Sequence, residues 1–252
     1  MARRSLLRLL LSVSTALLLA SPAAAVPFDL FVFQDGVQIG TYSQATNWLT
    51  CSESGNTTTC GSDVNRVVGG LTLDSWSLFF DNDPIVLGNV AVINSAGVTA
   101  QFTLIFSLPV SSPLGPTTVT SGSVTGGVTD GTVNGIGATL SAPTGSSLYS
   151  ALIDGNLVTP FQTLYDAPYS LTSPSLGSAS LPAADFGIPN PPGLPGPTVN
   201  SSIGIRLDFT LTPGDSASFT SNFVVEVPEP TTGVLIGLGL LGVAAVSRRR
   251  TA

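Results

Sequence analysis

The chain has 252 residues, which is enough for one ordinary domain or at most two small ones. Charged residues make up 9% of it, against about 25% in an average protein, and the chain has no histidine and no lysine. This composition excludes histidine acid–base catalysis, histidine metal ligation, Ser-His-Asp and Cys-His nucleophiles, lysine Schiff bases and lysine-dependent phosphate loops.

The first 25 residues have the three parts of a secretory signal peptide. Three arginines precede a short apolar run at 9–20, and small residues follow it. Ala23 and Ala25 occupy the −3 and −1 positions that signal peptidase accepts, so we expect cleavage before Val26. The alternative is an uncleaved N-terminal anchor, which the short apolar run disfavours.

The segment 26–227 is strongly acidic. It holds 14 Asp and Glu residues and only two basic residues, Arg66 and Arg206, so its formal net charge is −12. Nucleic-acid binding needs clusters of Lys and Arg, so this surface disfavours nucleic acid as a partner. The carboxylates could instead attract divalent cations.

Alternation of apolar and polar residues predicts β-strands along this segment. From Ile203 to Leu211 every second residue is apolar, and a turn at 213–215 should connect this strand in a hairpin to a last strand containing Phe219 and Phe223. The other expected strands are 28–33, 37–42, 67–80, 85–93, 98–108, 117–125, 132–140 and 148–157. This number of short strands with polar turns predicts an all-β fold, an antiparallel β-sandwich resembling a jelly roll.

Cys51 and Cys60 are the only cysteines, and nine positions separate them. In an exported chain this spacing predicts a disulfide that closes a surface loop and contributes about 2–3 kcal/mol. A two-cysteine metal site is the weaker alternative, because no histidine is present to complete it.

The densest acidic cluster is Asp81-Asn82-Asp83-Pro84. Asp81 and Asp83 are candidate calcium ligands, because calcium prefers several oxygen ligands. The alternative is a turn in which Asp and Asn accept backbone hydrogen bonds before a proline. Apart from this candidate calcium site, the sequence indicates no cofactor.

Six prolines lie in 182–197, which predicts a long loop or extended segment, with a domain linker as the alternative. Catalysis would have to rely on carboxylates alone, as in a glycoside hydrolase. No pair of carboxylates is singled out, and Trp48 and Trp76 are better explained by loop cover and core packing than as sugar platforms. The sequence therefore predicts no enzyme.

The C-terminal 25 residues have three parts of their own. Pro228, Glu229 and Pro230 precede an uncharged apolar run at 231–247, and a basic tip follows, consisting of Arg248, Arg249 and Arg250. The run has 17 residues, so a helix of about 25 Å would be slightly short of a hydrocarbon core of about 30 Å, but an uncharged run can still insert with local thinning of the bilayer. The basic tip should stay cytoplasmic and leave the acidic segment outside.

This arrangement resembles the PEP-CTERM sorting signal of Gram-negative bacteria, whose matching parts are 228–230, 231–247 and 248–250. The resemblance implies that an exosortase recognises the signal, removes the tail and passes the protein toward the cell surface or an extracellular matrix. A permanent single-pass anchor is the alternative.

The sequence thus predicts a signal peptide at 1–25, an exported β-sandwich domain at 26–227 and a sorting signal at 228–252. We expect a structural protein of the cell surface or extracellular matrix, which starts as an inner-membrane-anchored intermediate with its domain in the periplasm. Signal peptidase, an exosortase and exopolysaccharide are the expected partners. The alternative functions are a carbohydrate- or calcium-dependent matrix-binding module and, more remotely, a carboxylate-based glycoside hydrolase.

Overall fold

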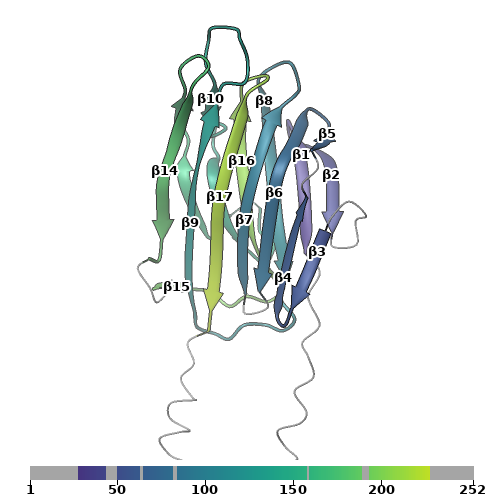
Figure 1. Cartoon of the computed structure of the whole chain (residues 1–252). Helices are drawn as coiled ribbons and strands as arrows, with labels where there is room; N and C mark the ends of the chain where they lie inside the picture. The colour runs from purple at the N-terminus through teal and green to yellow at the C-terminus, as the bar shows by residue number, and fades with distance from the viewer. Residues whose placement is uncertain are drawn as a thin grey trace, which may run out of the picture.

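The computed structural model describes residues 28–43, 50–62, 65–81, 84–157, 159–188 and 193–227. The regular elements within these residues are all β-strands. They form two antiparallel sheets that face each other as a sandwich (Figure 1). The predicted all-β sandwich is confirmed.

The first sheet, which we call sheet A, has β16 and β8 at its centre. Its main path runs through β12 (Gln162–Asp166), β11 (Ser147–Ile153), β16 (Ser202–Leu211), β8 (Ala100–Pro109), β1 (Asp29–Gln34) and β2 (Val37–Ser43). Two short strands extend it, because β10 (Thr139–Ser141) pairs with β16 and with β13 (Ser170–Thr172).

The second sheet, sheet B, has β17 and β7 at its centre. Its main path runs through β14 (Ser178–Phe186), β9 (Thr118–Thr129), β17 (Ser216–Glu226), β7 (Ile85–Asn94), β6 (Leu71–Asp81), β4 (Thr57–Ser62) and β3 (Thr50–Ser54). The short strands β15 (Leu194–Gly196) and β5 (Arg66–Val68) pair with β9 and β6.

The core lies between the sheets and follows the predicted alternation. On β16 the apolar residues that begin at Ile203 and end at Leu211 are at most 1% exposed, as the sequence predicts. Phe209 of this strand packs against Phe219 of β17, with ring centroids 5.0 Å apart. The two sheets therefore share one hydrophobic core.

The predicted hairpin of the last two strands is wrong. The strands β16 and β17 lie in different sheets, and residues 212–215 carry the chain from one sheet to the other. Each of the two strands already has a partner on both edges: β8 and β11 flank β16, and β7 and β9 flank β17. Both strands are thus central, and neither has an edge left for the other.

The strand predicted at 132–140 is also wrong for most of its length, because the chain is irregular until β10 starts at Thr139. Asp130 accepts hydrogen bonds from the amide and hydroxyl of Thr132, which favours a turn. Gly137 then takes a φ of +79°, and a Cβ there would lie 2.2 Å from the carbonyl oxygen of Ser173. This close approach requires glycine and interrupts any strand.

The proline-rich segment is more regular than predicted. Pro182 lies in β14 and Pro195 in β15, and both strands pair with β9 of sheet B. The register of β14 shifts between Leu181 and Ala184, so the proline falls at an irregularity on an outer strand, where a missing amide hydrogen is tolerated.

The first and last strands place the two described ends of the chain at the same end of the sandwich (Figure 1). Asp29 of β1 pairs with Ser107, close to the end of β8, and Ser202 at the start of β16 pairs with Pro109. Since β17 runs back from the 212–215 crossover, its last residue Glu226 reaches that same end.

Candidate functional site

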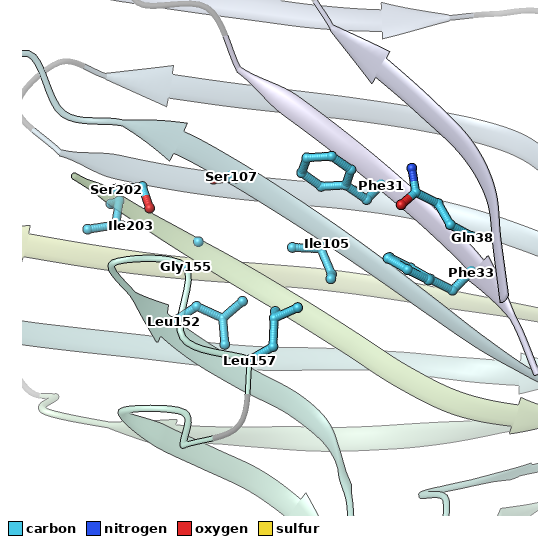
Figure 2. A pocket seen from close by; sticks show the side chains of 11 residues that line it. Phe31, Phe33, Gln38, Ile105, Ser107, Leu152, Gly155, Leu157, Ser202 and Ile203 are labelled. Carbon is cyan, nitrogen blue, oxygen red and sulfur yellow. The ribbon is translucent and has the colours of Figure 1, made fainter. Parts of the chain in front are cut away.

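The outer face of sheet A carries an apolar groove of about 260 Å³. Its floor is formed by Ile105 and Ser107 of β8 and by Gly204 of β16. Figure 2 shows Ile105 between two walls, one built from β1 and the other from the end of β11 with the loop that follows. The apolar wall residues are Phe31, Phe33, Leu152 and Leu157.

The hollow exists because Gly204 has no side chain on the outer face. In register, Gly204 lies between Ser107 of β8 and Leu152 of β11. A Cβ at this position would lie 2.6 Å from the carbonyl oxygen of Phe106, so the packing of the two strands itself requires glycine. The close strand approach and the groove thus depend on the same residue.

Asp154 holds the loop that forms the second wall. It has a φ of +56°, and one carboxylate oxygen accepts hydrogen bonds from the amides of Asn200 and Ser201, at 2.8 and 2.7 Å. The side-chain amide of Asn200 donates to the other oxygen at 2.9 Å. Partial burial raises the pKa of Asp154, but these hydrogen bonds outweigh it, and the pKa lies below the ordinary value.

Arg206 supports the same wall from the sheet. Its Nη1 donates to the carbonyl oxygen of Leu157 at 2.8 Å, and its Nη2 donates to the hydroxyl of Ser150 at 3.1 Å. The forked guanidinium therefore connects the loop to β11, and a single ammonium group could not hold both contacts in this geometry.

Beyond Arg206 the outer face becomes polar. Asp208 is buried there and accepts hydrogen bonds from Gln101, Thr103 and Ser146, with distances of 2.9, 3.1 and 2.6 Å. Its two oxygens are thus occupied by protein donors. The groove and this polar cluster divide the outer face into two chemically different halves.

The groove has the chemistry of a binding site for an apolar group. Its lining contains three polar side chains, Gln38, Ser107 and Ser202, and no charged one. Pockets of this kind bind by burying apolar surface, and a few polar groups orient the ligand. The lining residues offer no pairing of a nucleophile with a base.

Sequence reasoning missed this groove, although one signal was present. The run from Phe28 to Phe33 is apolar at nearly every position, so both faces of β1 carry large side chains. In a strand whose outer face is solvated, every second residue should be polar. Phe31 and Phe33 therefore pointed to something that covers the outer face.

The predicted disulfide is confirmed. Cys51 and Cys60 are bonded, with their Cα atoms 4.1 Å apart, and they lie directly opposite each other on β3 and β4. The enclosed segment is a regular hairpin whose turn contains Gly55 at a φ of +62°. The sequence predicted the bond but not the hairpin, because the Ser- and Thr-rich segment has no alternation of apolar and polar residues.

The calcium prediction stays a prediction. Asp81 ends β6, whereas Asp83 lies outside the described residues. Within the described ranges no group of three or more Cys, Asp or Glu residues is arranged to hold a metal ion. Trp76 is 5% exposed and belongs to the core, as expected, and Trp48 lies outside the described residues.

The two terminal signals also lie outside the described residues, so the structure does not test the roles predicted for their residues. This applies to the cleavage-site residues Ala23, Ala25 and Val26 and to the sorting residues Pro228, Glu229, Pro230, Arg248, Arg249 and Arg250. In the part of the chain that is described, no helix has the length and apolarity to cross a membrane. The span expected at 231–247 falls beyond that part.

Comparison with protein families decides the nature of the C-terminal segment. A model described as the PEP-CTERM protein-sorting motif matches residues 226–250. The chain carries a PEP-CTERM sorting motif. A search of curated proteins finds no match to the chain.

The PEP-CTERM motif supports an exported protein that is anchored in a membrane, processed by an exosortase and then associated with the surface. The motif starts at Glu226, the last residue of β17. A central strand of sheet B therefore leads into the PEP-CTERM segment with no intervening linker.

Proposed function

We propose that the protein is a structural component of the cell surface or extracellular matrix. The observation that carries this proposal is the direct continuation of β17 into the PEP-CTERM motif at Glu226. The sorting signal carries a domain connected in this way. While the tail anchors the unprocessed intermediate, force on the tail acts on a strand that is paired on both edges.

The composition supports the structural role. The exported segment has no histidine or lysine, and its 14 acidic residues face only two arginines. Such a surface repels copies of itself and stays soluble at high concentration. Signal peptidase would remove residues 1–25, the inner membrane would hold the intermediate, and exopolysaccharide would be the matrix partner.

The test replaces the central acid of the motif. Glu229→Ala should block removal of the C-terminal tail and retain the protein in the inner-membrane fraction. Mass spectrometry of the mature C-terminus and cell fractionation would measure both effects. Asp185→Ala is the matched control, because Asp185 is an exposed acid on β14 and lies outside the motif at 226–250.

Wild-type and Asp185→Ala proteins should be processed alike. If the tail of the wild type is uncut and its location equals that of Glu229→Ala, the sorting proposal fails.

A second candidate function is a binding module at the cell surface, and the groove on sheet A favours it. The ligand class expected from the sequence is a matrix carbohydrate, with calcium at Asp81 and Asp83 as a proposed cofactor, whereas the lining of the groove itself favours an apolar group. Binding to a glycan array that disappears with a chelator would support the calcium-dependent form, and chelator-resistant binding would remove calcium from it.

A further inference from the structure

We propose that the groove on the outer face of sheet A binds a single short hydrocarbon chain from a free, uncharged amphiphile. The proposal gives a ligand class to the second candidate function, the binding module, and does not depend on sorting. It starts from an anomaly: Phe31 and Phe33 place two aromatic rings on the solvent side of β1, where polar residues belong.

The walls of the groove are held in place before any ligand arrives. Arg206 holds the carbonyl of Leu157, and Asp154 fixes the start of the same loop against Asn200 and Ser201. Leu157 is nevertheless 44% exposed, although it faces the floor residue Ile105 (Figure 2). A wall fixed by polar bonds that still exposes its apolar side chain loses little entropy when a ligand covers it.

The size of the groove indicates a short chain. A water-sized group occupies about 30 Å³, so 260 Å³ holds about nine methylene-sized groups. Burial of each methylene is favourable, and an alkyl chain needs no hydrogen-bond partner inside the site.

The polar groups nearby do not suit a sugar. A sugar needs several donors and acceptors, yet the lining offers only Gln38, Ser107 and Ser202. Neither Arg206 nor Asp208 lines the groove, and both carboxylate oxygens of Asp208 already accept hydrogen bonds from protein donors. The three uncharged side chains are sufficient for one hydroxyl headgroup.

The charge of the domain selects against an anionic headgroup. The segment 26–227 carries a formal net charge of −12, and no basic side chain lines the groove. The groove lies on the outer face of sheet A, in the half nearest the end where the chain leads to the sorting motif, since Ser107 and Ser202 line it. A hydrocarbon core of about 30 Å needs lipid chains longer than the groove holds, so a free short-chain amphiphile fits it better than a bilayer lipid.

Photoaffinity labelling of the full chain in its native membranes tests the proposal. The probe is decanol with a diazirine on its last carbon, and labelled peptides are identified by mass spectrometry. Labels should fall on peptides that contain Phe31 and Phe33 or Leu152 and Leu157. Excess decanol should abolish them, whereas maltohexaose should not.

Leu157→Asp should reduce the labelling about tenfold, because a wall methyl pair is replaced by a carboxylate. Leu87→Asp is the matched control, since Leu87 is 37% exposed on β7 of sheet B and should leave the labelling unchanged. Phe33→Ser is a second groove variant, and protease resistance of each variant shows that it is folded.

Three outcomes would overturn the proposal: equal labelling of Leu157→Asp and Leu87→Asp, competition by maltohexaose in place of decanol, or preferential labelling by a diazirine-bearing phosphatidylcholine in the same membranes. Labelling of Glu229→Ala at the wild-type level separates this result from any failure of the sorting proposal.

Discussion

Two aspartates at the end of the sandwich far from the termini show how single carboxylates organise its loops. Asp130 accepts the amide of Thr132 on one oxygen and the amide of Leu176 on the other, at 2.9 and 2.8 Å. Asp215 accepts the amide of Gly131 at 3.2 Å and the hydroxyl of Thr212. Together they tie the 130–138 loop to two neighbouring turns.

The two carboxyl groups have opposite pKa shifts. The hydrogen bonds from Leu176 and Thr132 lower the pKa of Asp130 below 3.8. Burial, with the nearby Asp130 charge as a smaller contribution, raises the pKa of Asp215 above 3.8. Ionised Asp130 therefore favours the folded state, whereas ionised Asp215 disfavours it.

Asn substitutions should separate these effects. At pH 7, Asp130→Asn should lower the melting temperature by several degrees, because an amide nitrogen cannot accept the second backbone amide. Asp215→Asn should leave it unchanged or raise it slightly, because one oxygen still accepts Gly131. Thermal melts across pH measure both.

The sign of each effect follows from linkage. The stability supplied by Asp130 is present above pH 3.8 and is lost as the pH falls below it, so the deficit of Asp130→Asn should shrink there. Any gain of Asp215→Asn should vanish as the pH falls toward 3.8. Equal melting temperatures of the two variants at pH 7 would contradict this account.

At the scale of elements, the β3–β4 hairpin depends on its disulfide. Among the described strands β3 pairs with β4 alone, and its sequence is rich in Ser and short of large apolar residues. Cys60 is buried in the core, so the bond connects the edge strand to the interior. Without it, little apolar burial retains β3.

Removal of the disulfide should therefore cost about 2–3 kcal/mol and free the edge first. The double variant Cys51→Ser, Cys60→Ser should show increased amide exchange in β3 while β6 and β7 stay protected. Hydrogen exchange with mass spectrometry measures this, and Glu53→Gln in the same hairpin is a control that keeps the bond. Uniform loss of protection across both sheets would argue against a local role.

The elements that the sequence predicted well are those whose stability comes from one buried face. β16 has a clean alternation because its outer face is solvated or polar, and its inner face meets β17. β3 and β4 were missed because register and the disulfide, not apolar periodicity, hold them. The β16–β17 crossover was misread as a hairpin because a Pro-Gly turn is compatible with both connections.

The groove was harder to predict than the disulfide, because the residues that form it are far apart in the sequence. The disulfide joins residues close in sequence, so their spacing and the expected export of the chain were enough to predict it. The groove instead depends on Gly204 lying beside Ser107 and Leu152, which come from strands distant in the sequence. Only the register of the assembled sheet brings these positions together.

At the scale of the whole molecule, aromatic pairs connect the two sheets. Phe28, which precedes β1, stacks on Phe80 of β6 with ring centroids 4.5 Å apart, and Phe209 meets Phe219 at 5.0 Å. Tyr149 of β11 adds a polar link, since its hydroxyl donates to the carbonyl oxygen of Asn222 in β17 at 2.7 Å. Because the sheets share one core and several such contacts, we expect that neither sheet stays folded without the other.

Phe219→Ala in the segment 26–227 tests this coupling. Loss of a fully buried ring should cost about 3–5 kcal/mol, and both sheets should unfold in one transition. In a Trp48→Phe background, tryptophan fluorescence of Trp76 reports on sheet B, and backbone exchange of β11 reports on sheet A. Phe33→Ala, on the outer face, is the matched control and should cost much less. If the two probes gave separate midpoints, the sheets would be independent units, and β17 could not transmit anchoring force to the whole domain.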